Sequence, residues 1–184
     1  TEKAAQTLRE TIGASFTISG NIGSLKFDED ETGYNAEKIP VPAQTVMQIL
    51  NMDGINAYNA KQHSLIQAEG INYLSGMPEG NLSANTDTAC QMDFVSGILE
   101  LSDGRHITAG DKGAAIISDR LAEENHLGIG SEMILKSASH SRQEQMKVRI
   151  AGIYSSDNRM EYDDDTIFSS HDVFWKLSGQ ETSA

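Results

Sequence analysis

The apolar residues of this chain come in short periodic segments, and none of these segments forms a long apolar run. The longest uninterrupted apolar stretch is Ala114–Ile117, far below the ~18 consecutive apolar residues that a membrane-spanning helix needs. Some segments alternate with period two, as in a half-buried strand, and others repeat every three or four residues, as in an amphipathic helix. The 184 residues therefore predict a globular chain that mixes helices and strands, in one ordinary domain or two small ones.

Charge and cysteine content narrow the possible functions. The chain has 27 acidic and 14 basic residues, a net charge of -13, which disfavours binding to nucleic acids and to anionic lipids through basic clusters. Cys90 is the only cysteine, which excludes an intrachain disulfide and a cysteine-rich zinc site. The sequence begins with Thr-Glu-Lys rather than Met, so we expect it to be a piece of a longer protein.

The periodic segments predict an ordered series of elements. Helical spacing and turn residues predict helices over the first twelve residues, after Pro42, after Ser118 or Asp119, and after Ser169 with Gly179 at its end. Alternation or short apolar runs predict strands at 14–18, 55–60, 94–101, 114–117, 133–136, 146–150 and 166–168. Residues 21–38 are predicted as an exposed loop or hairpin, and residues 70–93 as loops and short strands.

These elements predict an α+β fold with two subdomains. Residues 1–68 and 146–184 would together form a core subdomain built from βαβ-like units, because strand–helix–strand patterns occur at both ends of the chain. Residues 69–145, which are richer in loops, would form an inserted subdomain of mixed helices and strands.

Two acidic segments are candidate cation sites. Asp28 and Asp30 occupy the first and third positions of a calcium-loop pattern, and Gly33 occupies the sixth, but the twelfth position is Ile39 instead of a glutamate. The pattern therefore favours a solvated acidic loop. The same interpretation is preferred for Asp163–Asp165, because neighbouring aspartates in an extended segment point to opposite faces.

Other candidate sites are equally incomplete. Gly128-Ile129-Gly130 resembles part of a phosphate-binding loop, but it follows a helix, and a tight helix-to-strand turn is favoured. Cys90 is expected to be a small, mostly buried side chain, and Trp175 a core or contact residue. No histidine falls in a pattern typical of hydrolases or metal sites, and surface positions are favoured for His63, His106, His126, His140 and His171. The sequence thus predicts no catalytic, cofactor-binding, nucleotide-binding or metal-binding residues, and leaves substrate-binding residues open.

The order of motifs from Gly104 to Ser156 resembles a known family. The matching pieces are Gly104-Arg105, Ile116-Ile117-Ser118, Leu121-Ala122, Leu127-Gly128-Ile129-Gly130 and Val148–Tyr154, followed by Thr166-Ile167-Phe168 and Leu177-Ser178-Gly179. Leu8–Ser19 and Met52-Asp53-Gly54-Ile55 add to the likeness. Together these pieces are similar to the extracytoplasmic core domain of MacB-like or FtsX-like ABC transporter permeases. The chain departs from the family pattern at Ser131, where an acidic residue is common, and it ends before the family's final strand.

The resemblance implies a non-catalytic domain held outside the cytoplasmic membrane by a full-length permease in the cell membrane. Residues 1–68 and 146–184 would lie near the membrane, and residues 69–145 would lie distal to it. ATP would be hydrolysed by a separate ATP-binding subunit, and the domain would serve export or mechanotransmission. The implied partners are that subunit, a second permease copy or paralogue, and an exported peptide or other substrate.

Two other functions remain open at the level of the sequence. The first alternative is an independent extracytoplasmic module that binds a peptide or a protein. The second is a small hydrolase whose active site is not visible in the sequence pattern. A transmembrane helix directly before Thr1 would favour the permease, and an activity screen with and without metal would test the hydrolase.

Overall fold

The computed structural model describes residues 16–19, 22–28, 33–38, 41–139, 144–156 and 164–179. Contacts between residues divide the chain into two compact units, Thr1–Ile55 and Asn56–Ala184. Helices and strands occur together, and parallel and antiparallel strand pairs share one sheet. The predicted α+β class is therefore confirmed.

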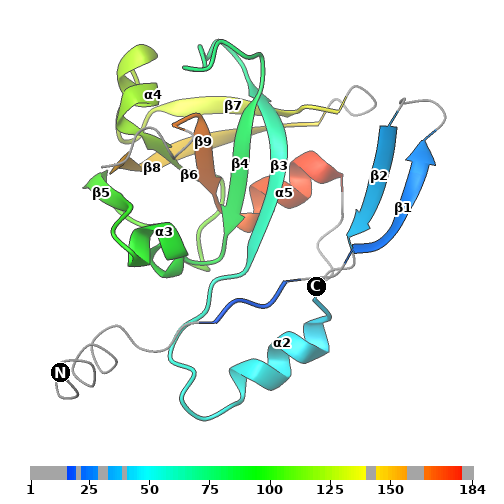
Figure 1. Cartoon of the computed structure of the whole chain (residues 1–184). Helices are drawn as coiled ribbons and strands as arrows, with labels where there is room; N and C mark the ends of the chain where they lie inside the picture. Colours follow the sequence, from blue (N-terminus) through cyan, green and yellow to red (C-terminus); the bar gives the residue numbers. More distant parts are fainter. Residues whose placement is uncertain are drawn as a thin grey trace. The chain divides into compact units, whose positions relative to one another are not determined.

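The first unit contains a hairpin and a helix (Figure 1). Strands β1 (Ile22–Asp28) and β2 (Gly33–Lys38) pair antiparallel. Helix α2 (Ala43–Leu50) begins after Pro42, whose extended backbone makes it the residue preceding the helix rather than part of its first turn. Of the side chains that the structure describes in this unit, none is fully buried.

The second unit contains the larger sheet. Its elements in chain order are β3 (Lys61–Ala68), β4 (Gly80–Asn85), the 3-10 helix η1 (Thr88–Cys90), α3 (Met92–Val95), β5 (Leu99–Gly104), β6 (Ala114–Ser118), α4 (Asp119–Glu124), β7 (Glu132–Ser137), β8 (Gln145–Ser156), β9 (Thr166–Ser169) and α5 (His171–Ser178).

Strand pairing in this sheet closes on itself. The strand order is β5-β8-β6-β9-β4-β3-β7, and β7 also pairs with β8. Closure is possible because β8 is long: residues 145–149 pair with β7, whereas residues 152–156 pair with β5. Within the described residues, six strands thus form a closed ring, and β5 is attached to the outside of that ring with one edge open.

The two faces of the strands bury two hydrophobic clusters. All six ring strands contribute to the larger cluster, which α4 and α5 complete; its members include Ile66, Leu82, Ile117, Leu135, Ile150, Ile167, Leu121 and Val173. The smaller cluster contains Leu99, Ile107, Ala114, Ile116, Tyr154 and Phe168, with Phe94 of α3 packed against it. Successive residues on β6 and β9 serve different clusters, as the period of two in a strand requires.

Local sequence signals explain several element ends. Ser118 Oγ accepts a hydrogen bond from the backbone N–H of Leu121 at 3.0 Å, so of the two predicted capping residues Ser118, and not Asp119, caps α4. Gly179 adopts a left-handed conformation, with φ of 62°, and ends α5 as predicted. The predicted strands at 114–117, 133–136, 146–150 and 166–168 correspond to β6, β7, β8 and β9, and the hairpin alternative for residues 21–38 is confirmed.

Other predicted elements are wrong. Residues 16–19 form no strand, residues 56–60 are irregular, and the strand predicted from residue 94 begins only at Leu99. Phe94 instead lies in α3, because its ring packs in the smaller cluster while Gln91 caps the helix by accepting from Asp93 and Phe94. The helix predicted after Ser169 is α5, but Ser170 and not Ser169 directly precedes it, and the Ser170 hydroxyl accepts from the backbone N–H of Ala114 at 3.2 Å. The helix predicted over the first twelve residues lies outside the described residues.

The division of the chain also falls at a different place from the predicted boundaries. The boundary between the two compact units follows Ile55 in the sequence. The sheet of the second unit unites β3, β8 and β9, from the predicted core, with β4 to β7, from the predicted insert. The expectation that residues 1–68 and 146–184 lie near a membrane, with residues 69–145 distal to it, stays a prediction.

Candidate functional site: the junction at His171

The backbone that leads into β3 is held by a set of side-chain hydrogen bonds within the second unit. The amide of Asn59 donates to Asn85 Oδ1 at 2.7 Å, and its oxygen accepts from the backbone N–H of Asp87 at 3.1 Å. Asn85 is 1% exposed and in turn donates to the carbonyl oxygen of Ser83 at 2.8 Å. Hydrogen bonds to the end of β4 thus fix the position of the residues that precede β3.

His171, the first residue of α5, completes this junction. Its Nε2 lies 3.0 Å from the carbonyl oxygen of Ala60 and 3.1 Å from Thr86 Oγ1, and its Nδ1 lies 3.2 Å from Gln62 Oε1. The same Ala60 carbonyl accepts from the backbone N–H of Thr86 at 3.1 Å. One imidazole therefore joins α5 to the start of β3 and to the residue after β4. We call the residues Asn59, Ala60, Gln62, Asn85, Thr86 and His171 the His171 junction.

The surroundings of His171 determine its protonation. Burial lowers its pKa, while the bond to the Ala60 carbonyl and the charge of Asp172 act in the opposite direction. A carbonyl oxygen only accepts, so Nε2 carries the proton, and Nδ1 of the neutral ring accepts from Gln62 when the amide N–H is turned toward it. Because Nε2 already donates to Ala60, His171 is poorly placed to take a proton from the Thr86 hydroxyl. The junction suits an anchoring role rather than acid–base chemistry.

The residues on either side of His171 also bind backbone. Ser170 is 2% exposed, and Asp172 Oδ2 accepts from the backbone N–H of Gly113 at 3.0 Å. His171 is half-buried, so the surface position expected for it is only partly correct. Alternation and helical spacing report apolar faces only, so they gave no signal for a polar group that is buried by partners remote in sequence.

A second histidine is fixed in a similar way. Thr88, which is fully buried, accepts from the backbone N–H of Ile107 at 2.9 Å and lies 3.1 Å from Nδ1 of His106. The ring of Phe94 meets the His106 ring edge-on at 5.0 Å. Burial lowers the pKa of His106, against the opposing charge of Asp87. His106 thus lies half-buried against Phe94, beside the smaller cluster, so the surface position expected for it is also only partly correct.

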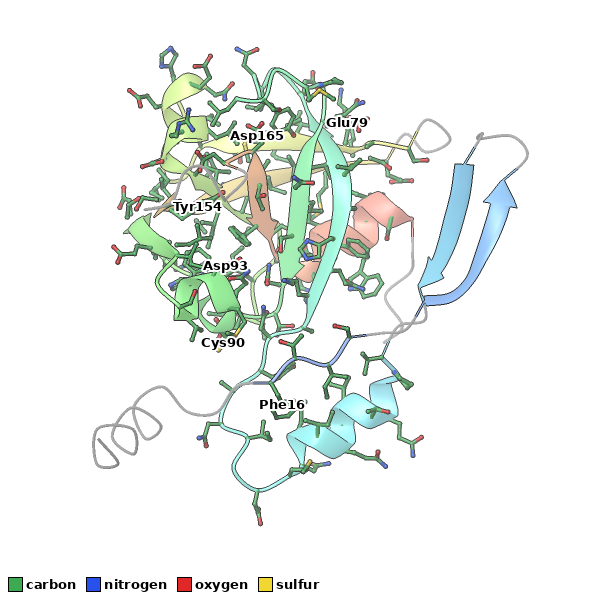
Figure 2. All side chains as sticks on the ribbon, viewed as in Figure 1. Phe16, Glu79, Cys90, Asp93, Tyr154 and Asp165 are labelled. Carbon is green, nitrogen blue, oxygen red and sulfur yellow. The ribbon has the colours of Figure 1, made fainter. Side chains whose placement is uncertain are left out.

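Cys90 lies at the end of η1, near Asp93 of α3 (Figure 2). Its thiol is half-buried, whereas the sequence analysis expects a mostly buried side chain. The Sγ atom lies 3.8 Å from Asp87 Oδ2. Burial and then the charge of Asp87 raise the pKa of the Cys90 thiol. A raised pKa keeps the thiol protonated, whereas a nucleophilic cysteine needs the thiolate.

The acidic segment near residue 165 is a structural element. Asp165 accepts from the backbone N–H groups of Leu74 at 2.6 Å and Ser75 at 2.8 Å, and Asp164 forms an ion pair of 2.7 Å with Arg120. Both aspartates are almost fully buried, so a solvated loop is the wrong interpretation for them. Asp163 lies outside the described residues. Asp165 and Cys90 lie at opposite ends of the second unit (Figure 2).

The remaining candidate motifs have ordinary structural places. Asp28 and Gly33 pair across the β1–β2 hairpin, so strands and not helices flank that acidic loop, whose residues 29–32 lie outside the described part. The Gly128–Gly130 segment forms the predicted turn between α4 and β7. Trp175 packs edge-on against Phe174 in α5. Among the described residues, no three His, Cys, Asp or Glu side chains are grouped as a metal site would need.

The chain is similar to an ABC transporter permease. It is 22% identical over 188 residues to the uncharacterized ABC transporter permease YclI of Bacillus subtilis (strain 168), a match that covers 84% of this chain. The chain spans only 38% of that protein's length. No family model matches the sequence.

A solved domain attributed to a permease protein of Porphyromonas gingivalis also matches, at 15% identity over 66% of this chain and 56% of the other, with a TM-score of 0.32. In the described part of the chain, no helix is both long enough and apolar enough to cross a membrane.

Proposed function

We propose that this chain is an extracytoplasmic domain of an ABC transporter permease, of the MacB-like or FtsX-like type. In this role it has no catalysis of its own and transmits conformational change between the membrane and the outside. The observation that carries the proposal is the similarity to an ABC transporter permease over 84% of the chain. ATP hydrolysis would belong to an ATP-binding subunit that the full-length permease contacts in the cytosol.

The His171 junction supports a mechanical role. A force applied along the segment that enters the second unit would act on Ala60, the residue directly before β3. The Ala60 carbonyl accepts hydrogen bonds from His171 of α5 and from Thr86 after β4, so these bonds would transmit the force to α5 and β4. The closed ring of strands gives these bonds a rigid base, because each ring strand is paired on both sides. The proposal includes two further partners. One is a second permease copy or a paralogue, and the other is an exported peptide or another substrate.

The test is a distance measurement in the complete transporter. Spin labels are placed on Gln48→Cys in α2 and Glu123→Cys in α4, both exposed positions, with Cys90→Ser removing the chain's own thiol. The distance distribution is measured by pulsed electron paramagnetic resonance with and without ATP and vanadate. The proposal predicts that the distribution shifts when nucleotide is trapped.

A matched pair of variants connects this movement to the junction. His171→Ala is expected to broaden or abolish the nucleotide-dependent shift, while Lys112→Ala, an exposed position before β6, retains it. An unchanged distribution on nucleotide trapping, in a transporter that hydrolyses ATP, would contradict the proposed coupling.

A further inference from the structure

The outer edge of β5 is an open strand edge. Among the described residues, β5 pairs only with β8, and it is the terminal strand of the sheet. Figure 1 shows β5 at the periphery of the second unit, with α3 next to it. A strand edge of this kind presents backbone N–H and C=O groups that another extended chain can pair with.

Exposed apolar side chains occur at both ends of β5. Ile98, directly before the strand, is 42% exposed, and Ile129 is 44% exposed. Ile129 lies on the β8 side of the end of β5, because the position that a Cβ on Gly104 would occupy is close both to Ile129 Cδ1 and to the backbone of β8 at Gly152. Met92 and Val95 of α3, in the segment that leads into β5, are exposed by 47% and 44%. Apolar side chains of a bound strand would therefore find contacts near the start of β5.

The charges of β5 favour a positively charged partner over a second copy of this chain. Glu100 and Asp103 are the only charged residues of the strand, and both are exposed. The neighbouring cation, Arg105, is already engaged, because its guanidinium donates to both oxygens of Asp111 at 2.8 and 2.7 Å. Two copies of this edge would bring like charges together, in a chain whose net charge is -13, which disfavours pairing between copies.

The strand also has a fixed position. Gly104 and Gly152 face each other across β5 and β8, and a Cβ on Gly152 would lie 2.7 Å from the carbonyl oxygen of Arg105. This close approach holds the end of β5 against β8. A fixed edge needs little reorganisation when a partner strand is added.

We propose that the open edge of β5 docks an extended, cationic peptide segment that adds a strand to the sheet, with basic side chains facing Glu100 and Asp103 and an apolar side chain facing Ile98. This inference does not depend on the transporter role, because it concerns the 184-residue chain alone. Its failure would leave the coupling experiment above unaffected.

The test uses a defined peptide, acetyl-Lys-Val-Lys-Val-Lys-Val-Lys-amide, titrated into the isotopically labelled chain and followed by amide chemical shifts. We expect saturable shifts concentrated on the amides of residues 98–104. The same peptide with proline in place of its central valine is expected to bind at least about tenfold more weakly, because proline removes a backbone donor from the added strand. The Glu-Val counterpart is expected not to bind.

Matched variants separate this site from general attraction to an acidic chain. Glu100→Lys combined with Asp103→Lys should weaken binding by about tenfold or more, because each reversal replaces an attraction with a repulsion. Glu123→Lys combined with Glu124→Lys changes the net charge equally on exposed positions of α4 and should leave the affinity within about twofold. Shifts spread over the acidic surface, equal loss from both double variants, or equal binding of the proline peptide would overturn the proposal.

Discussion

Nε2 of His171 and the carbonyl oxygen of Ala60 lie 3.0 Å apart, although the two residues are separated by 111 positions in the chain. This hydrogen bond joins the first residue of α5 to the segment that enters β3. His171→Ala removes it, together with the contacts to Gln62 and Thr86. We expect the free energy of unfolding to fall by about 1–3 kcal/mol, because partly buried acceptors lose their donor.

Urea unfolding followed by circular dichroism measures this change. Lys112→Ala, at an exposed position before β6, is the control and should stay within about 0.5 kcal/mol of the wild type. Equal stability of His171→Ala and wild type would show that the His171 junction does not hold the segment.

Stability should also depend on pH through the two half-buried histidines, His106 and His171. Burial lowers the pKa of both His171 and His106 below the ordinary value of 6.5. The unfolded chain therefore binds more protons than the folded one as pH falls below 6.5. The contribution of each neutral ring is present above pH 6.5 and is lost as pH falls through the lowered pKa.

The free energy of unfolding, measured between pH 8 and pH 5, should therefore decline over the lower part of that range. In His171→Gln combined with His106→Gln the decline should be shallower, because two groups that take up protons on unfolding are gone. An unchanged slope in the double variant would contradict the lowered pKa values.

Asp165 is expected to be the most sensitive of the described carboxylates. Asp165→Ala leaves the backbone N–H groups of Leu74 and Ser75 without their acceptor. The two donors are only partly shielded from water, so we expect the free energy of unfolding to fall by about 1–3 kcal/mol in total, and the thermal and urea midpoints should both fall. Glu123→Ala, on the exposed side of α4, serves as the control and should leave both midpoints nearly unchanged.

The approach of β5 to β8 gives a steric prediction. Gly152→Ala would place a Cβ 2.7 Å from the carbonyl oxygen of Arg105 and 2.9 Å from Leu101 Cδ1. Overpacking of this kind costs about 1–3 kcal/mol. Gly128→Ala is a suitable comparison, since an added Cβ there has nothing within 4 Å. If calorimetry gave both variants the same melting temperature, the close approach would not exist.

The sequence predicted the elements whose signals are local. Ser118 caps α4, Gly179 ends α5, and the alternation of Met146, Val148 and Ile150 marks β8. In each case the signal depends on residues within a few positions of one another, so the pattern alone was sufficient.

The elements that were mispredicted depend on distant partners. Apolar spacing predicts Phe94 in a strand, but Phe94 lies in α3, and its ring packs against Tyr154 of β8 and Phe168 of β9. The closed ring of strands could not be foreseen either, since it requires β7 and β5 to share one side of β8. Strand neighbours of this kind are set by tertiary packing and not by local spacing.

The candidate site was missed for the same reason. His171 was identified only as one of five histidines, because its partners Ala60 and Thr86 lie far from it in the sequence. Asp165 stood in an acidic run that is typical of a solvated loop, yet its acceptors are filled by backbone donors some ninety positions away. Sequence spacing carries no information about such pairs.

The proposed location outside the membrane is the central claim, and site-specific labelling tests it most directly. In the full-length permease, Cys90→Ser is combined with Ser96→Cys, at an exposed position after α3, and other reactive cysteines are removed. Intact cells are treated with a membrane-impermeant maleimide, and labelling is compared before and after lysis. The proposal predicts full labelling of Ser96→Cys in intact cells. Labelling that occurs only after lysis would place the domain in the cytoplasm and contradict the account.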